Sequence, residues 1–296
     1  MTIQRMFVAG AGLMGHGIAQ VHASIGLGVV LYEPELARAE AGLARIAANL
    51  ERAVSKGRLD GTARDATLGR IRPTADLTAI RDADLVIEAV FEDLEVKSRL
   101  WRELDRLAPP IAVFASNTSS ISIDRLASAV SESRREQFVG MHFFSPVPVM
   151  PLVELIRGAA TSTATEAAIR ELAARLGKQV IVSTDRPGFI VNRMLMPLLA
   201  EAMRALEEGV GTAEDIDAGA RIGLNHPMGP LELADFIGLD VCLDVMRVLD
   251  EGLDGDRFTP PALLVRLVEA GHLGQKTGHG FYSYPRVSPG RGGLEG

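Results

Sequence analysis

The chain has 296 residues, of which 47% are hydrophobic and 23% charged, with a formal net charge of −7. This length allows two hydrophobic cores, and the acidic balance offers no basic footprint for nucleic acid. A single cysteine excludes an internal disulfide, no apolar run approaches the ~20 residues of a membrane span, and the early first strand leaves no room for a signal peptide. We therefore expect a cytoplasmic globular protein with no membrane or nucleic-acid partner.

The first motif is a glycine-rich turn between the apolar run Met6–Ala9 and a helical pattern. Its first glycine allows a tight turn, the second leaves room for phosphates, and the third lets the helix pack on its strand. The amino terminus of the helix then attracts an anion. This order favours a dinucleotide over the alternative, an ordinary glycine-rich turn of an α/β protein. The candidate contacts are Gly10, Gly12, Leu13, Met14 and Gly15.

A second strand, Val29–Tyr32, is predicted to end on Glu33, eighteen residues after Gly15. An acid at this place accepts hydrogen bonds from an adenosine ribose and repels a 2′-phosphate. The sequence therefore favours NAD over NADP.

Strand and helix patterns alternate up to about residue 185, and from Phe189 onward the pattern is helical. We expect an α/β fold: a Rossmann-type, mostly parallel sheet domain over residues 1–186, a hinge at Asp185–Gly188, and an all-α C-terminal domain over 187–296. A long helical stretch from Pro34 to Lys56 exceeds what a crossover needs and is expected to project. The clearest strands are Met6–Ala9, Val29–Tyr32, Leu85–Val90, Ala112–Ala115, Phe138–His142 and Gln179–Val182; the C-terminal helices are Val191–Glu208, Ala213–Ile222, Leu231–Leu249 and Pro261–Ala270.

A histidine and an acid are the strongest candidates for chemistry. His142 ends the strand Phe138–His142, at the sheet edge where ligands bind, and histidine is suited to taking a proton from an alcohol near neutral pH. Glu154 follows twelve residues later inside an apolar run, where an acid is costly to bury without a partner. We expect the carboxylate to orient the imidazole and stabilise its protonated form. The alternatives are a structural histidine and an acid on the exposed face of an edge strand.

Two further polar segments lie near the same edge or at the domain boundary. The hydroxyls of Ser116–Ser120, after the strand Ala112–Ala115, either hold a reacting oxygen or cap the next helix. Asn192, just past the hinge, either contacts a developing carbonyl or the nicotinamide, or packs at a helix start. The six histidines and one cysteine show no metal-ligand spacing, so no metal is expected.

Together these segments resemble the L-3-hydroxyacyl-CoA dehydrogenase family over nearly the whole chain. The resemblance implies reversible, NAD-dependent oxidation of an (S)-3-hydroxyacyl-CoA to a 3-oxoacyl-CoA, in fatty-acid β-oxidation or 3-hydroxybutyryl-CoA metabolism, and a homodimer formed by the helical domain. The matching segments are Gly10–Ala19, Asp84–Lys97, Ser116–Ser120, Gly140–Val153, Pro187–Arg193, His226–Pro230 and Lys276–Tyr282.

The resemblance also implies roles for single residues. His142 is the general base and Glu154 its partner, with Ser119 and Asn192 at the 3-oxygen of the substrate. The long helical stretch is the arm over coenzyme A, with Lys56 near its end as a substrate contact. The implied NAD contacts are Gly10, Gly12, Leu13, Met14, Gly15, Glu33, Glu92, Lys97, Ser119, Ser145 and Lys276.

Two residues depart from the family pattern, and two other functions stay open. Ser145 stands where asparagine is common, and Glu33 replaces the usual aspartate. One alternative is a dehydrogenase of a free or carrier-bound 3-hydroxy acid, of the gulonate or carnitine type. Phe143 argues against it, because gulonate relatives tend to have proline there. The other alternative is a catalytically idle NAD-binding protein of the crystallin type.

Overall fold

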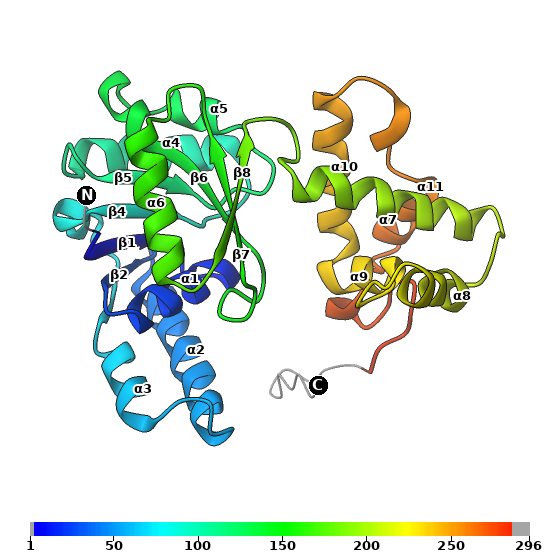
Figure 1. Cartoon of the computed structure of the whole chain (residues 1–296), viewed down its shortest axis with the longest axis horizontal. Helices are drawn as coiled ribbons and strands as arrows, with labels where there is room; N and C mark the ends of the chain where they lie inside the picture. Colours follow the sequence, from blue (N-terminus) through cyan, green and yellow to red (C-terminus); the bar gives the residue numbers. More distant parts are fainter. Residues whose placement is uncertain (1–2, 286–296) are drawn as a thin grey trace. The chain divides into compact units, whose positions relative to one another are not determined.

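The computed structural model describes residues 3–285. This part of the chain divides after Arg186 into two compact units, residues 3–186 and 187–285 (Figure 1). Among residues 3–285, every helix is too short or too polar to cross a membrane.

The first unit is built on one eight-stranded sheet. Its strand order is β3-β2-β1-β4-β5-β6-β7-β8, and every neighbouring pair is parallel except β6 and β7. The expected Rossmann-type, mostly parallel sheet is therefore confirmed. The strands are β1 (Arg5–Ala9), β2 (Gly28–Tyr32), β3 (Ile71–Thr74), β4 (Leu85–Glu88), β5 (Val113–Ser116), β6 (Phe138–Phe143), β7 (Leu152–Arg157) and β8 (Gln179–Thr184).

Six α-helices accompany this sheet. Because successive residues of a strand point to opposite faces, the central strands offer an apolar surface to helices on both sides. The longest helix, α2, extends with α3 beyond the sheet, as expected for a projecting arm (Figure 1). The helices are α1 (Leu13–Ser24), α2 (Leu36–Ser55), α3 (Gly61–Leu68), α4 (Leu94–Leu107), α5 (Ile123–Ala127) and α6 (Thr163–Arg175).

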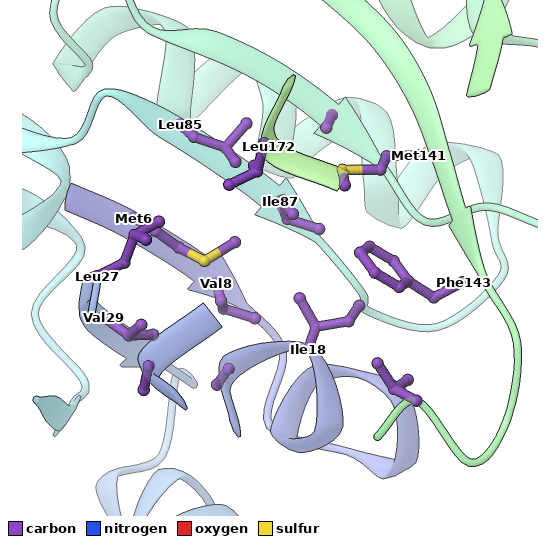
Figure 2. Packing of buried hydrophobic residues seen from close by; sticks show 14 of the residues in the cluster. Met6, Val8, Ile18, Leu27, Val29, Leu85, Ile87, Met141, Phe143 and Leu172 are labelled. Atoms are coloured by element: carbon purple, nitrogen blue, oxygen red, sulfur yellow. The ribbon is translucent and has the colours of Figure 1, made fainter. Parts of the chain in front are cut away.

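The two faces of the sheet carry separate cores. On one face Ile18 of α1 and Leu172 of α6 join Val8, Met141 and Phe143 from the strands (Figure 2). On the opposite face Trp101 of α4 stacks on Phe114 of β5 and meets Phe138 of β6 edge-on, with ring centroids 4.9 and 4.8 Å away. Buried large side chains on both faces make the sheet a rigid platform for the loops at its edge.

Two strands were not predicted from the sequence. β3 has only four residues and contains Pro73, a residue that usually argues against a strand. β7 coincides with the apolar run around Glu154, and its pairing with β6 is the one antiparallel step of the sheet. The six strands expected from the pattern are all present, with ends shifted by at most two residues.

The second unit is helical, as expected. One prediction was wrong: the single helix expected over Leu231–Leu249 is two helices, because Gly238 adopts a φ of 107° that breaks the helix between them. Buried Met203, Leu231 and Leu243 belong to its core. The helices are α7 (Val191–Glu207), α8 (Ala213–Ala218), α9 (Pro230–Ile237), α10 (Leu239–Gly252) and α11 (Ala262–Glu269).

Candidate active site

The candidate residues of the first unit gather where parallel strands end. β1, β2, β4, β5 and β6 run in the same direction, so their carboxyl ends share one edge of the sheet. Gly10 follows β1, Glu33 follows β2, Glu92 lies after β4, Ser119 after β5 and Ser145 after β6. In open α/β sheets, ligands bind at this edge, where the order of connection reverses.

The glycine turn between β1 and α1 is shaped by steric limits. Gly10 has a φ of 105°, and a Cβ there would lie 2.5 Å from the Ala89 carbonyl oxygen. A Cβ on Gly15 would overlap the carbonyl oxygen of Gly10. Gly12 differs, because a Cβ on it would meet nothing within 4 Å. Gly10 and Gly15 are thus required by the fold itself, whereas Gly12 borders open space.

This turn fits the pyrophosphate of a dinucleotide. Gly12 is the N-cap of α1, has no capping side chain, and is followed by no acid in the first turn, so the helix N–H groups and dipole stay available to an anion. Glu33 Oε1 accepts a hydrogen bond of 2.7 Å from the Ala11 backbone N–H, which holds this acid beside the turn. The exposed Leu13 and half-buried Met14 begin the helix. These features fit NAD.

His142 and Glu154 are brought together by the antiparallel pairing of β6 and β7. The two residues are direct register partners, so their side chains leave the sheet on the same face. His142 Nδ1 lies 3.2 Å from Glu154 Oε2. Glu154 is 0% exposed and His142 5% exposed. The alternative of a solvent-exposed acid on an edge strand is wrong, because β8 covers the outer side of β7.

The contacts of the imidazole fix its tautomer. A carboxylate only accepts, so Nδ1 carries the hydrogen that bonds to Glu154. Nε2 of the neutral ring is then the unprotonated nitrogen, and it lies 3.1 Å from the Ser119 hydroxyl oxygen. The arrangement presents a basic nitrogen and a hydroxyl group side by side near the ligand edge, which suits proton transfer with an alcohol.

Glu92 anchors the loop that carries Ser119. Its Oε1 accepts hydrogen bonds from the backbone N–H groups of Ser119 (2.9 Å) and Ser120 (3.0 Å), and from the hydroxyls of Thr118 (2.5 Å) and Ser120 (2.9 Å). Burial opposes the charge of Glu92, but the Lys97 ammonium and these hydroxyls lower its pKa. The Glu92 carboxylate, with a side chain 37% exposed, therefore supports the loop as an anion.

Lys97 lies beneath Glu92. Its side chain is 1% exposed, and its ammonium contacts Glu92 at 3.2 Å and the buried Glu88 at 2.5 Å. Glu88 also accepts a 2.6 Å hydrogen bond from the Ser116 hydroxyl. Sequence reasoning missed Glu88, although an acid within the apolar run Leu85–Val90 is the same signal that singled out Glu154.

Asn117 was also missed. Its Oδ1 accepts a 2.9 Å hydrogen bond from the Phe143 backbone N–H, one residue after His142. The loop after β5 is thereby tied to the end of β6, so Ser119 and His142 are fixed to each other by backbone as well as side-chain contacts. An asparagine directly before Thr-Ser-Ser was a readable turn signal.

Three candidate residues belong to segments other than the loops that follow these strands. Lys56 is the exposed C-cap of α2, a helix of 20 residues and therefore about 30 Å long, which begins near Glu33. Asn192 lies in the first turn of α7 and Lys276 in a 3₁₀ turn (Gln275–Thr277), both in the second unit. Lys276 contacts Asp240 at 2.5 Å. Within residues 3–285 there is no cluster of three or more residues able to hold a metal ion.

Comparisons with known proteins match both units of the chain to one family. Residues 5–186 match the family described as 3-hydroxyacyl-CoA dehydrogenase, NAD binding domain, and residues 188–284 match its C-terminal domain. A 3-hydroxybutyryl-CoA dehydrogenase of Bradyrhizobium diazoefficiens is 52% identical over 97% of this chain and 98% of its own. The crystal structure of FadB2 from M. tuberculosis matches with a TM-score of 0.94 and 48% identity, over 96% of this chain and all of that one. The (S)-3-hydroxybutyryl-CoA dehydrogenase of Ralstonia eutropha gives 0.93 and 43% over the same shares.

Proposed function

This chain belongs to the 3-hydroxyacyl-CoA dehydrogenase family, and we propose that it oxidises a short (S)-3-hydroxyacyl-CoA, of the 3-hydroxybutyryl type, with His142 as the general base. The chain is an NAD-dependent oxidoreductase, and the reaction is reversible. The residue assignment rests on the buried contact between His142 Nδ1 and Glu154. His142 Nε2 faces the Ser119 hydroxyl, at the same sheet edge as the glycine turn.

The proposed chemistry assigns one task to each group. When bound, NAD supplies the acceptor for the hydride that leaves carbon 3 of the substrate. His142 Nε2 takes the proton of the 3-hydroxyl group, and the charge that appears on the imidazole is balanced by Glu154, 3.2 Å from Nδ1. The Ser119 hydroxyl holds the substrate oxygen beside Nε2. In the reverse direction the protonated His142 donates the same proton to the carbonyl oxygen.

The cofactor end of the site is assigned on the same basis. Gly10, Gly12 and Gly15 shape the turn and the helix amino terminus for the pyrophosphate, and Glu33 binds the ribose. We assign Leu13, Met14 and Ser145 to further NAD contacts, and Glu92 to the support of the Ser119 loop. Asn192 and Lys276 are assigned to the 3-oxygen and the cofactor, and Lys56 to coenzyme A.

The size of the acyl group is proposed from the relatives. Those in Bradyrhizobium diazoefficiens and Ralstonia eutropha are named for 3-hydroxybutyryl-CoA. We therefore expect acetoacetyl-CoA to be reduced with a higher kcat/KM than 3-oxoacyl-CoA esters of longer chains, and NADH to be preferred over NADPH because of Glu33.

A kinetic panel tests this function. Purified protein is assayed with NADH or NADPH against 3-oxoacyl-CoA esters of increasing length, free acetoacetate, and an acetoacetyl thioester of a carrier protein. Fastest turnover of acetoacetyl-CoA with NADH supports the proposal. Faster turnover of the free acid or the carrier thioester supports the corresponding alternative, and NADH binding without turnover of any thioester supports an idle protein.

We also propose a homodimer and a cytoplasmic location. Several large apolar side chains of the second unit are exposed in the single chain, among them Met194, Val210, Ile222, Leu224 and Val241. Apolar surface of this kind is typical of subunit interfaces. Sedimentation of the purified protein at twice the mass of the chain supports the dimer, and cell fractionation tests the location.

A further inference from the structure

The connection between β6 and β7, residues 144–151, links the strands that carry the two proposed catalytic residues. It starts directly after the strand of His142 and ends at the strand of Glu154. Its exposed residue Ser145, assigned above to NAD, lies three positions after His142. A shift of this connection would therefore move a cofactor contact relative to the base.

A lysine from a distant part of the sequence holds this connection. Lys178, between α6 and β8, donates hydrogen bonds of 2.8 Å to the Val147 carbonyl and 2.7 Å to the Met150 carbonyl. The residue is 9% exposed, and burial lowers the pKa of its ammonium. An ammonium group is costly to bury, and hydrogen bonds from a charged donor are stronger than neutral ones, so the two carbonyls are held firmly.

The connection is also packed against α1. Val147 is buried, and a Cβ on Gly17 would lie only 3.0 Å from the Val147 Cβ. The Gln179 backbone N–H adds a third tie, a 2.7 Å hydrogen bond to the Pro151 carbonyl. Residues 147–151 are thus fixed to the helix that begins at the glycine turn and to the start of β8, while Ser145 remains open to a ligand.

We propose that Lys178 is a positioning residue of the dehydrogenase, whose ammonium fixes the β6–β7 connection so that Ser145 lies correctly for NAD. The proposal rests on the function proposed above and on the cofactor role of Ser145. The Lys178 ammonium is not assigned to NAD or to the substrate. It acts through the Val147 and Met150 carbonyls, which a side chain without donors would release.

The test compares Lys178→Met with a matched control at the same end of α6. Arg175 donates a 3.0 Å hydrogen bond to the Ile3 carbonyl. Arg175→Met therefore also removes a contact between a cation and a carbonyl, but it leaves the contacts of the β6–β7 connection intact. In Lys178→Met we expect the NADH Kd to rise about tenfold and the Val149 and Met150 amides to exchange hydrogen about tenfold faster. Lys178→Arg, which keeps the charge and donors, should restore most of the affinity. Arg175→Met should leave both quantities close to wild type.

The fixing role, the positioning role and the proposed function can each be contradicted by a different measurement. Unchanged amide exchange at Val149 and Met150 in Lys178→Met overturns the fixing role. Faster exchange with an unchanged NADH Kd and kcat overturns the positioning role. If the methionine variant does not fold, Lys178→Gln, with a donor on a shorter stem, takes its place and must raise the NADH Kd more than Arg175→Met does. Failure of the proposed function would appear in the wild-type protein, as no NADH oxidation with acetoacetyl-CoA.

Discussion

His142 and Glu154 stand directly opposite each other on two antiparallel strands, although twelve residues separate them along the chain. The position of this pair is set by the backbone ladder of the sheet rather than by a flexible loop. Both side chains are almost fully buried, so their contact is little screened by water. A base held in this way needs little reorganisation when it receives a proton.

The first prediction concerns the base itself. His142→Gln keeps a polar side chain of similar size but cannot take up a proton. We expect kcat for acetoacetyl-CoA reduction to fall by at least about 10²-fold, the usual contribution of a general acid–base group, while the NADH Kd stays near the wild-type value. Stopped-flow turnover and NADH fluorescence titration measure the two quantities. A loss of less than tenfold in kcat would mean that another group moves the proton.

The second prediction separates charge from orientation at Glu154. Glu154→Gln keeps an oxygen that accepts from Nδ1, but it removes the negative charge that stabilises the imidazolium. kcat/KM for alcohol oxidation should therefore fall, because the positive charge that develops on the imidazole loses its partner at Nδ1. kcat/KM measured in both proteins checks this, with the NADH Kd as the control for cofactor binding. An unchanged kcat/KM would show that the carboxylate charge does not act on the base.

Much of this site was readable from the sequence because its residues sit at predictable places. The glycine turn, Glu33 and His142 each follow an expected strand, and strand ends of a parallel sheet share one edge. The contact of Glu154 with His142 was inferred from the cost of burying an acid and from the family resemblance. The antiparallel β7 that creates it was not predicted, since pairing between strands is a long-range property.

Other features depend on tertiary contacts that no local pattern reports. The family resemblance implied that Lys97 contacts NAD, and no local pattern indicates that the fold buries its ammonium between two acids. The break at Gly238 was not predicted, because a single glycine within a helical pattern is also compatible with an uninterrupted helix. Asn192 and Lys276 were assigned by resemblance, and their roles stay proposals.

The third prediction concerns this buried lysine. Lys97→Met leaves the Glu88 carboxylate buried without its counter-charge, so unfolding free energy should fall by about 3 kcal/mol or more. Glu92 loses the cation that lowers its pKa and should become protonated at higher pH, which weakens its hold on the Ser119 loop and reduces kcat. Urea unfolding and kcat as a function of pH provide the measurements. In the double variant Glu88→Gln/Lys97→Met, stability should largely recover while kcat remains low. Recovery of both would show that Lys97 affects catalysis only by stabilising the fold.

The fourth prediction contrasts two glycines of the same turn. Gly15→Ala places a methyl group onto the Gly10 carbonyl and should destabilise the protein by about 1–3 kcal/mol. Gly12→Ala meets no protein atom within 4 Å, so stability should change by no more than about 0.5 kcal/mol. Its methyl group would occupy the space left for the phosphates, and the NADH Kd should rise about tenfold or more. Thermal unfolding and NADH titration of both variants test the contrast. Normal NADH affinity in Gly12→Ala would place the pyrophosphate elsewhere.

The fifth prediction is a pH dependence of stability that originates in α1. Burial, and to a smaller extent the charges of Lys178 and Arg175, lower the pKa of His22 from 6.5 to about 4, against a hydrogen bond to the Ile18 carbonyl. The unfolded chain binds a proton at this histidine below its ordinary pKa, but the folded chain does not. The contribution of His22 to the unfolding free energy is therefore fully present above the pKa of the unfolded chain. It is lost, by up to about 3 kcal/mol, as the pH falls toward the pKa of His22 in the folded protein.

His22→Leu tests this loss, because leucine fills the apolar site without a titrating group. We expect the unfolding free energy of the wild type to fall more steeply between pH 6.5 and about 4 than that of His22→Leu. Urea unfolding at several pH values measures both proteins. The two proteins differ only at this residue, so the difference between their slopes isolates the proton of His22. Equal slopes in these two proteins would contradict a neutral, buried His22.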